Sequence, residues 1–138
     1  MTGEFIVAVH AIVFLNHKSK KMTSEAIAEN VCTNPARIRK VMAKLKKANL
    51  IETKEGSIQG GYAFCLNPKE VTLHQIFNAV DDTVVSTSWK SGNPDMECLI
   101  ASGMAEVMEK IVERMDDSCK EILKTITVHD IDNQIFNV

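Results

Sequence analysis

The sequence predicts a mainly α-helical protein with a small β-hairpin wing, built as a winged helix-turn-helix domain followed by a long helix. Three observations lead to this prediction. Residues 5–48 hold three short helical patterns, residues 51–66 hold two strand patterns around a glycine-rich loop, and an apolar repeat runs through 104–126. The order helix, helix, helix, hairpin is that of a winged helix-turn-helix. We place this domain over residues 1–80 and a loop with the long helix over 81–138.

The first three helices are predicted from apolar spacing and from capping residues. Apolar side chains recur at helical spacing over residues 5–16. Thr23 is a good N-cap for a second helix over residues 24–31. Asn34 caps a third helix that begins at Pro35, a position where the missing N–H costs nothing. The short connection between the second and third helices leaves the third exposed, as in a helix-turn-helix.

The hairpin and the fourth helix are predicted from a change of period after residue 50. Residues 51–54 and 62–66 alternate as short strands, and the loop "EGSIQGG" lies between them. Thr72 and Gln75 form a capping box, which starts a fourth helix that ends at Val80.

The last part of the chain is predicted to be a loop followed by one long helix. Residues 81–101 show only a weak pattern. Apolar side chains then recur three or four residues apart, so one helix of roughly 20 residues or more carries a continuous seam. Thr127 and Asp130 are expected to cap a final turn. The seam consists of Met104, Met108, Ile111, Met115, Cys119 and Ile122.

Charge is divided unevenly along the 138 residues, whose formal net charge is -2. Residues 1–66 carry ten Lys and Arg against five Asp and Glu, whereas residues 67–138 carry six against thirteen. We therefore expect a basic half that meets a polyanion such as double-stranded DNA. The most apolar stretch, residues 5–15, is too short to span a bilayer and lacks the pattern of a signal peptide. A cytoplasmic protein with no membrane partner is expected.

The segment "TNPARIRKVMAKLKKANL", residues 33–50, holds six of the sixteen basic side chains and no acidic one. On a helical wheel, Ile38, Val41, Met42 and Leu45 form a narrow buried face of helix 34–48. Cations on both shoulders and small residues on the leading face suit the DNA major groove, although a solvated amphipathic helix shows the same pattern. The residues expected to contact DNA here are Asn34, Ala36, Arg37, Arg39, Lys40 and Lys44, with Thr23 added at the start of the second helix.

Four short motifs occur together in this chain. They are the "T-x-x-x-IA" second helix, the "L-x-x-A-x-L" exit of the third helix, the "G…GGY" wing and the "VTL-x-x-I-x-x-AV" fourth helix. The set resembles the Rrf-two (Rrf2) family of bacterial transcription regulators, relatives of the iron–sulfur cluster regulator and the cysteine-metabolism repressor. The resemblance covers nearly the whole chain. It implies a homodimer that reads a pseudo-palindromic operator, usually as a repressor, with the long helix as the dimerisation helix.

Two departures from the family pattern change the expected site. Relatives often carry an arginine before the first wing glycine, where this chain has Glu55. The expected wing contacts that remain are Lys54, Ser57 and Gln59, so the third helix has to supply most of the affinity for DNA. Cluster-binding relatives hold iron through three cysteines ahead of the long helix, whereas only Cys98 stands there in this chain. No cofactor is expected, because one thiolate cannot hold an iron–sulfur cluster.

The remaining chemistry-bearing residues form no recognisable constellation. Cys98 is a candidate redox sensor, with an inert thiol as the alternative because Asp95 and Glu97 beside it disfavour the thiolate. Cys32 and Cys65 are expected in the core. No cysteine and histidine spacing typical of a metal site occurs, and no catalytic set is visible, so neither a metal site nor an enzyme is expected. A small-molecule or redox effector remains an open expectation.

One alternative function belongs to a different class. The chain could keep the family fold and act as a protein-interaction module that docks a partner enzyme. The acidic second half and the altered wing favour this alternative. Retention of a stoichiometric partner without DNA would distinguish it from a DNA-binding regulator.

Overall fold

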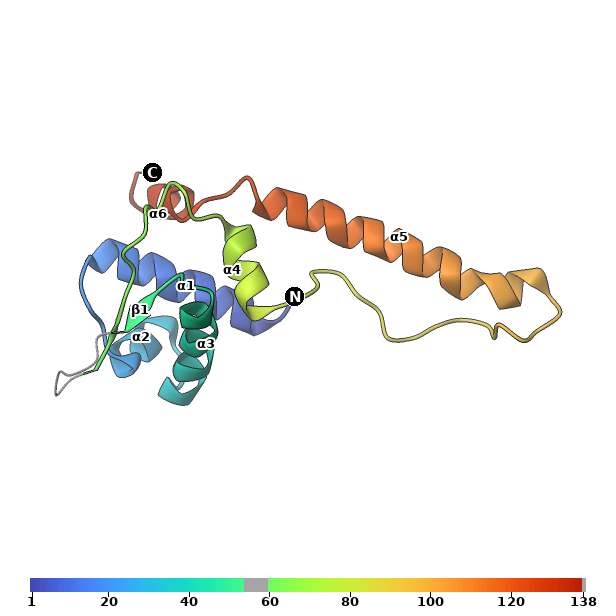
Figure 1. Cartoon of the computed structure of the whole chain (residues 1–138), viewed down its shortest axis with the longest axis horizontal. Helices are drawn as coiled ribbons and strands as arrows, with labels where there is room; N and C mark the ends of the chain where they lie inside the picture. The colour runs from blue at the N-terminus through green and yellow to red at the C-terminus, as the bar shows by residue number, and fades with distance from the viewer. Residues whose placement is uncertain (54–59, 138) are drawn as a thin grey trace.

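The computed structural model describes residues 1–53 and 60–137 (Figure 1). Over these residues the chain forms a helical body, a two-stranded hairpin and a long helix that projects from the body. The elements in chain order are α1 (Gly3–Lys18), α2 (Ser24–Val31), α3 (Pro35–Lys47), β1 (Glu52–Thr53), β2 (Tyr62–Ala63), α4 (Leu73–Val80), α5 (Leu99–Leu123) and α6 (Val128–Phe136). The predicted winged helix-turn-helix order with a long C-terminal helix is confirmed.

The helices of the body pack around one apolar core. Ile12 of α1, Ile27 of α2 and Phe77 of α4 are among its fully buried side chains. The ring of Phe5 meets that of Phe77 edge-on at a centroid distance of 5.4 Å, which joins the start of α1 to α4. Since α1 contacts α2, α3 and α4, it is the central element against which the helix-turn-helix is held.

The wing is anchored by a short antiparallel ladder. Glu52 pairs with Ala63 and Thr53 with Tyr62, so the described ladder is shorter than the predicted strands over 51–54 and 62–66. Met22, in the connection between α1 and α2, adds a bridge to Tyr62 through two backbone hydrogen bonds of 2.9 and 3.0 Å. The wing base is therefore tied to the residue that precedes the cap of α2. The predicted wing contacts Lys54, Ser57 and Gln59, and Glu55, lie outside the described residues.

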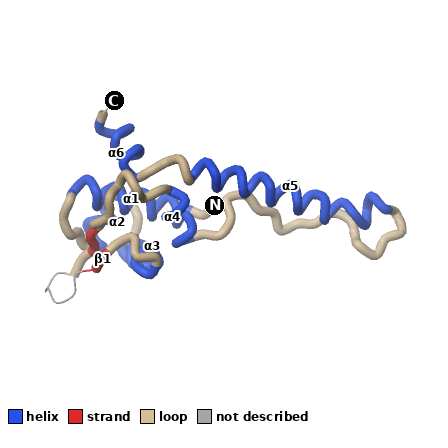
Figure 2. The backbone as a smooth tube through the Cα atoms, turned by 45° about the horizontal axis from the view of Figure 1, so that its top comes forward, coloured by secondary structure: helices blue, strands red, loops and turns tan. Residues whose placement is uncertain are grey.

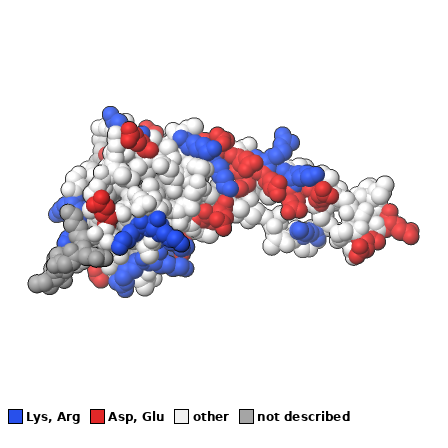
Figure 3. Space-filling model, viewed as in Figure 1, with Lys and Arg blue, Asp and Glu red and all other residues white. Residues whose placement is uncertain are grey.

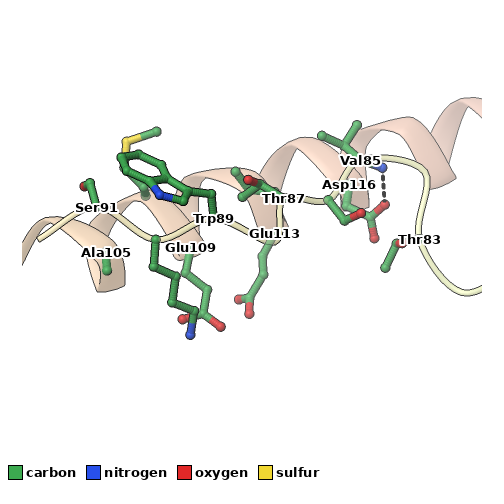
Figure 4. Close-up of a pocket in the computed structure, with 13 residues that line it drawn as sticks. Thr83, Val85, Thr87, Trp89, Ser91, Ala105, Glu109, Glu113 and Asp116 are labelled. Carbon is green, nitrogen blue, oxygen red and sulfur yellow. Dashed lines mark hydrogen bonds between the residues drawn. The ribbon is translucent and has the colours of Figure 1, made fainter. Parts of the chain in front are cut away.

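Residues 81–98 run beside α5 before the chain turns back into that helix (Figures 1 and 2). The carboxylate of Asp116 holds this segment against α5. Its Oδ1 accepts hydrogen bonds from the backbone N–H groups of Val84 and Val85 at 2.6 and 3.0 Å, the second of which is drawn in Figure 4. The other oxygen pairs with Lys120 at 2.9 Å. The loop predicted over 81–101 is therefore an ordered segment that extends only to Cys98. Residues 99–101 belong instead to the first turn of α5, which begins at Leu99.

The C-terminal residues return to the body. The final turn expected at Thr127 and Asp130 is instead a nine-residue helix, α6, which starts with a capping box formed by these two residues. Thr72 and Thr127 form a backbone bridge, and Val128 is fully buried in the core. α6 packs on α1, so residues beyond α5 stabilise the helix-turn-helix body. Within the described residues, no helix is long and apolar enough to span a membrane.

Candidate nucleic-acid interface

Local hydrogen bonds set the turn between α2 and α3. The Thr23 side chain accepts a hydrogen bond from the N–H of Ala26 and caps α2. Cys32 ends that helix in the left-handed conformation, with a φ of 64°. Asn34 then caps α3 by accepting a hydrogen bond from the N–H of Arg37 at 2.8 Å. The capping carboxamide leaves other N-terminal N–H groups of α3 able to meet a phosphate.

The two faces of α3 differ as the helical wheel predicted. Ile38, Val41, Met42 and Leu45 have no exposed surface and pack against the body. Burial of four such side chains fixes the rotation of the helix about its axis, since each stabilises the fold by about 2 kcal/mol. The side chains left exposed include Asn34, Ala36, Arg37, Arg39 and Lys40, and Lys44 is half-buried.

Acidic and small residues of α1 and α2 contact the cations of α3. Glu4, at the start of α1, lies 3.2 Å from the Nζ of Lys40 and 2.7 Å from the Nζ of Lys44. Arg39 lies 3.6 Å from Glu25 and donates a hydrogen bond to the hydroxyl of Ser24. Three of the four α3 cations predicted to contact DNA therefore already have an acidic neighbour within the protein.

Arg37 lies over the start of α1. A Cβ placed on Gly3 would come 2.6 Å from the Nη2 of Arg37, so the guanidinium group rests directly on this glycine. The side chain forms no ion pair with any residue in 1–53 or 60–137. Its charge is thus available at the surface of α3.

Two lysines of α3 favour the ionised form of Glu4. A hydrogen bond from the Lys44 ammonium group, supported by Lys40, holds the pKa of Glu4 below its ordinary value despite its partial burial. The Glu4 side chain is 19% exposed, so its ion pairs are screened less by salt than pairs on the open surface. The carboxylate is therefore a fixed negative charge beside the recognition helix.

The basic side chains gather on one side of the body. Figure 3 shows them as a patch over α3 and beside the base of the wing, while acidic side chains are frequent along the projecting arm. This arrangement matches the charge division predicted between the two halves of the chain. A patch of this sign on the second helix of a helix-turn-helix suits a phosphate backbone.

Sequence reasoning missed the contribution of α1 to this surface. Gly3 and Glu4 are more than thirty residues away from the α3 side chains that they contact. No local pattern reports such a contact, because it depends on how α1 crosses α3. The only available signal was the acidic residue in front of the apolar stretch of α1, which is also a common feature of helix N-termini.

The predicted seam on α5 forms an exposed apolar stripe on the projecting arm. Met104 is 39% exposed and Ile122 60%, with Met108, Ile111 and Met115 between them in value. Cys119 is half-buried. A helix of 25 residues is about 37 Å long, and an exposed apolar stripe of that length is typical of protein–protein interaction surfaces.

The cysteines lie at the surface more often than predicted. Cys32 and Cys65 are exposed, so their predicted place in the core is wrong: Cys32 lies in the helix-turn-helix turn and Cys65 follows the end of β2. Cys98 is exposed at the N-cap of α5. The backbone N–H groups of Ala101 and Ile100 at the helix start lower the pKa of the thiol.

Known proteins share both the sequence and the fold of this chain. The sequence model of the Rrf2 family, described as iron-dependent transcriptional regulators, matches residues 1–134. The chain belongs to the Rrf2 family. This Rrf2 protein is 25% identical over 136 residues to the HTH-type transcriptional regulator YwnA of Bacillus subtilis, with 99% of each chain covered.

Two solved structures show the same fold for this Rrf2 protein. A transcriptional regulator from Lactobacillus plantarum superposes with a TM-score of 0.83 at 23% identity, covering 98% of this chain and 91% of the other. IscR of T. potens superposes with a TM-score of 0.72 at 19% identity, covering 99% and 88%. The protein is thus a transcription regulator with a winged-helix fold and not an enzyme, and regulators of its family bind DNA.

The iron in the family description does not fit the residues present. In the described part of the chain, no group of three or more His, Cys, Asp and Glu side chains is arranged to hold a metal ion. Between α4 and α5 the sequence supplies one cysteine, Cys98, where an iron–sulfur cluster would need several thiolates.

Proposed function

We propose that this Rrf2 protein is a homodimeric repressor that reads a pseudo-palindromic operator with α3. The observation that carries the proposal is the division of α3 into a fully buried apolar face and an exposed face of cations and small side chains. Ala36 and Asn34 allow close approach to base edges, and Arg37 has no acidic partner among the described residues. These are the properties that a helix needs to enter a major groove.

Dimerisation supplies the second half of the proposal. The apolar stripe on α5 is exposed in the single chain and has the spacing of a helix–helix seam. Pairing of two such helices would present two copies of α3 on one face. A two-fold symmetric protein then matches two half-sites about one helical turn of DNA, roughly 34 Å, or a multiple of it, apart.

The test combines operator selection with a salt titration. Genomic DNA fragments retained by the purified full chain are sequenced, and the affinity for the enriched duplex is measured by fluorescence anisotropy at several salt concentrations. Arg37→Ala is expected to weaken binding and reduce the log–log salt slope by about one, because each phosphate contact releases counterions. Arg114→Ala, which removes the same charge from exposed α5, is the matched control.

A DNA affinity that does not change with salt concentration would contradict the proposal. Equal losses of DNA affinity in Arg37→Ala and Arg114→Ala would also contradict it. Retention of a stoichiometric protein partner with no DNA at low salt would instead support the protein-interaction module. Whether the protein represses or activates transcription is measured separately, by placing the enriched operator in front of a reporter gene. Repression requires that reporter output fall when the protein is present.

We also propose that this regulator acts without an iron–sulfur cluster. The lone Cys98 ahead of α5 supports this proposal, since a cluster needs several thiolate ligands. Protein purified without oxygen should show no visible absorbance of a cluster and should bind the operator with unchanged affinity after chelation. Visible absorbance that disappears together with DNA binding would overturn it.

A further inference from the structure

A groove of about 500 Å³ lies between α1, α2 and α6, away from the exposed face of α3. Apolar side chains line most of it: Val13 and Phe14 from α1, and Ile131, Ile135 and Phe136 from α6. Ile135 and Phe136 remain more than half exposed, so the apolar wall is not covered by the chain itself. The groove therefore offers uncovered apolar surface that a small molecule can fill.

Aromatic rings form part of the wall of this groove. The imidazole of His17 stacks on the ring of Phe136, with the two planes 4° apart and the centroids at 3.9 Å. The ammonium group of Lys18 lies 5.7 Å from the centre of the Phe14 ring. Two aromatic rings with an ammonium group close to one of them favour a planar ligand that carries negative charge.

The polar groups of the groove are basic or neutral. They are His10, His17 and Lys18 on α1 and Asn30 on α2, and no carboxylate is among the described lining residues. His10 and Asn30 are held together by a hydrogen bond of 2.8 Å. Asp132 is not among the lining residues and lies 3.7 Å from the Nδ1 of His17, whereas Lys18, which lies over the Phe14 ring, has no acidic partner among the described residues.

We propose that this groove binds a small aromatic carboxylate, its ring against Phe14 and Phe136 and its carboxylate toward Lys18. The apolar wall supplies most of the binding free energy through buried area, and the cation selects the anionic form. Asn30 lies two residues before Cys32, the residue that ends α2 in the helix-turn-helix turn. A bound ligand would thus join α1, α6 and the helix that positions α3.

The test uses 2-naphthoate as the probe and the full chain without DNA, so its result is independent of the proposed operator binding. Calorimetry and the fluorescence of the probe should show saturable binding at one site per chain. The neutral 2-naphthalenemethanol should bind about tenfold more weakly, and the cationic 2-naphthylmethylammonium should not saturate, because its charge faces Lys18.

Variants locate the site. Lys18→Gln is expected to weaken naphthoate binding about fivefold. Lys124→Gln, which removes the same charge near the end of α5, should leave it unchanged. Ile135→Trp fills the groove from an exposed position and should abolish binding while the circular dichroism spectrum stays that of the parent protein.

Equal affinity for the three naphthalene compounds, or saturable binding that survives Ile135→Trp, would overturn the proposal. Loss of binding in Lys124→Gln as large as that in Lys18→Gln would do the same, since it would show a general charge effect. Repeating the anisotropy measurement with naphthoate present then tells whether the site controls DNA affinity.

Discussion

Glu4 and Lys44 form an ion pair of 2.7 Å that joins the start of α1 to the recognition helix α3. The same carboxylate reaches Lys40 at 3.2 Å. Because two of the cations proposed to face DNA are partly neutralised in this way, the carboxylate would compete with the phosphate backbone for them. The contact has a second effect, since it fixes where α3 lies relative to α1.

Replacing Glu4 should strengthen DNA binding. Glu4→Gln frees Lys40 and Lys44, so affinity for a duplex of random sequence should rise severalfold, and the log–log salt slope should steepen by up to about 1.8. Anisotropy at several salt concentrations measures both quantities. Glu121→Gln, which removes a carboxylate paired with Lys124 on α5, is the matched control and should change neither. Weaker binding in Glu4→Gln would show instead that the carboxylate orients the lysines for DNA.

A charge on the α5 seam should prevent dimer formation. Ile111→Glu places a carboxylate in the middle of the apolar stripe, so the dimer dissociation constant should rise about 100-fold or more. Sedimentation analysis over a range of concentrations measures it. Lys110→Glu introduces the same side chain one position away, off the seam, and should leave the dimer intact. An unchanged sedimentation coefficient in Ile111→Glu would place the interface elsewhere.

The hydrogen bonds from the backbone of residues 84–85 to Asp116 should make the stability of the fold depend on pH in the acidic range. The N–H of Val85, with further contributions from Lys120 and Val84, holds the pKa of Asp116 below its ordinary value. A lowered carboxyl pKa stabilises the folded protein fully above the ordinary value of about 3.9, and this contribution is lost as pH falls through the folded pKa. Stability of the parent protein should therefore decline below about pH 4.

The variant Asp116→Ala isolates this effect. It leaves the N–H groups of Val84 and Val85 without their acceptor, so it should cost about 2 kcal/mol at pH 7. The difference in unfolding free energy between the variant and the parent protein should shrink as pH is lowered toward 3. Urea unfolding at several pH values measures this difference. A loss that stays constant with pH would mean that the charge of Asp116 contributes nothing.

Cys98 should be a reactive thiol. The backbone N–H groups of Ala101 and Ile100 at the start of α5 lower the pKa of its thiol and so raise the fraction of thiolate near neutral pH. Under limiting reagent, Cys98→Ser should remove the fastest phase of alkylation, while Cys119→Ser, at the half-buried seam cysteine, should retain it. Persistence of the fastest phase in Cys98→Ser would assign it to Cys32 or Cys65, the other exposed thiols.

Local signals in the sequence were sufficient for the helices and their faces. The caps at Thr23, Asn34 and Thr72 all form hydrogen bonds in the structure, because capping involves residues only three apart. The buried face of α3 follows from helical periodicity alone. The long helix was predicted for the same reason, but its start was placed too late. Gly92 and Pro94 favoured a loop up to residue 101, although Ile100 lies four residues before Met104 and continues the seam.

Tertiary contacts decided what surrounds the recognition helix. No spacing rule links Glu4 to Lys44, Asp116 to Val84 or His17 to Phe136, because each pair is joined by the way two helices or a helix and a segment cross. The sequence by itself determined which side of α3 faces the solvent, through a periodicity that any buried helix must obey. The tertiary structure alone decided that α1 sets a carboxylate among the cations of that side, because only the packed core brings residues forty positions apart within hydrogen-bonding distance.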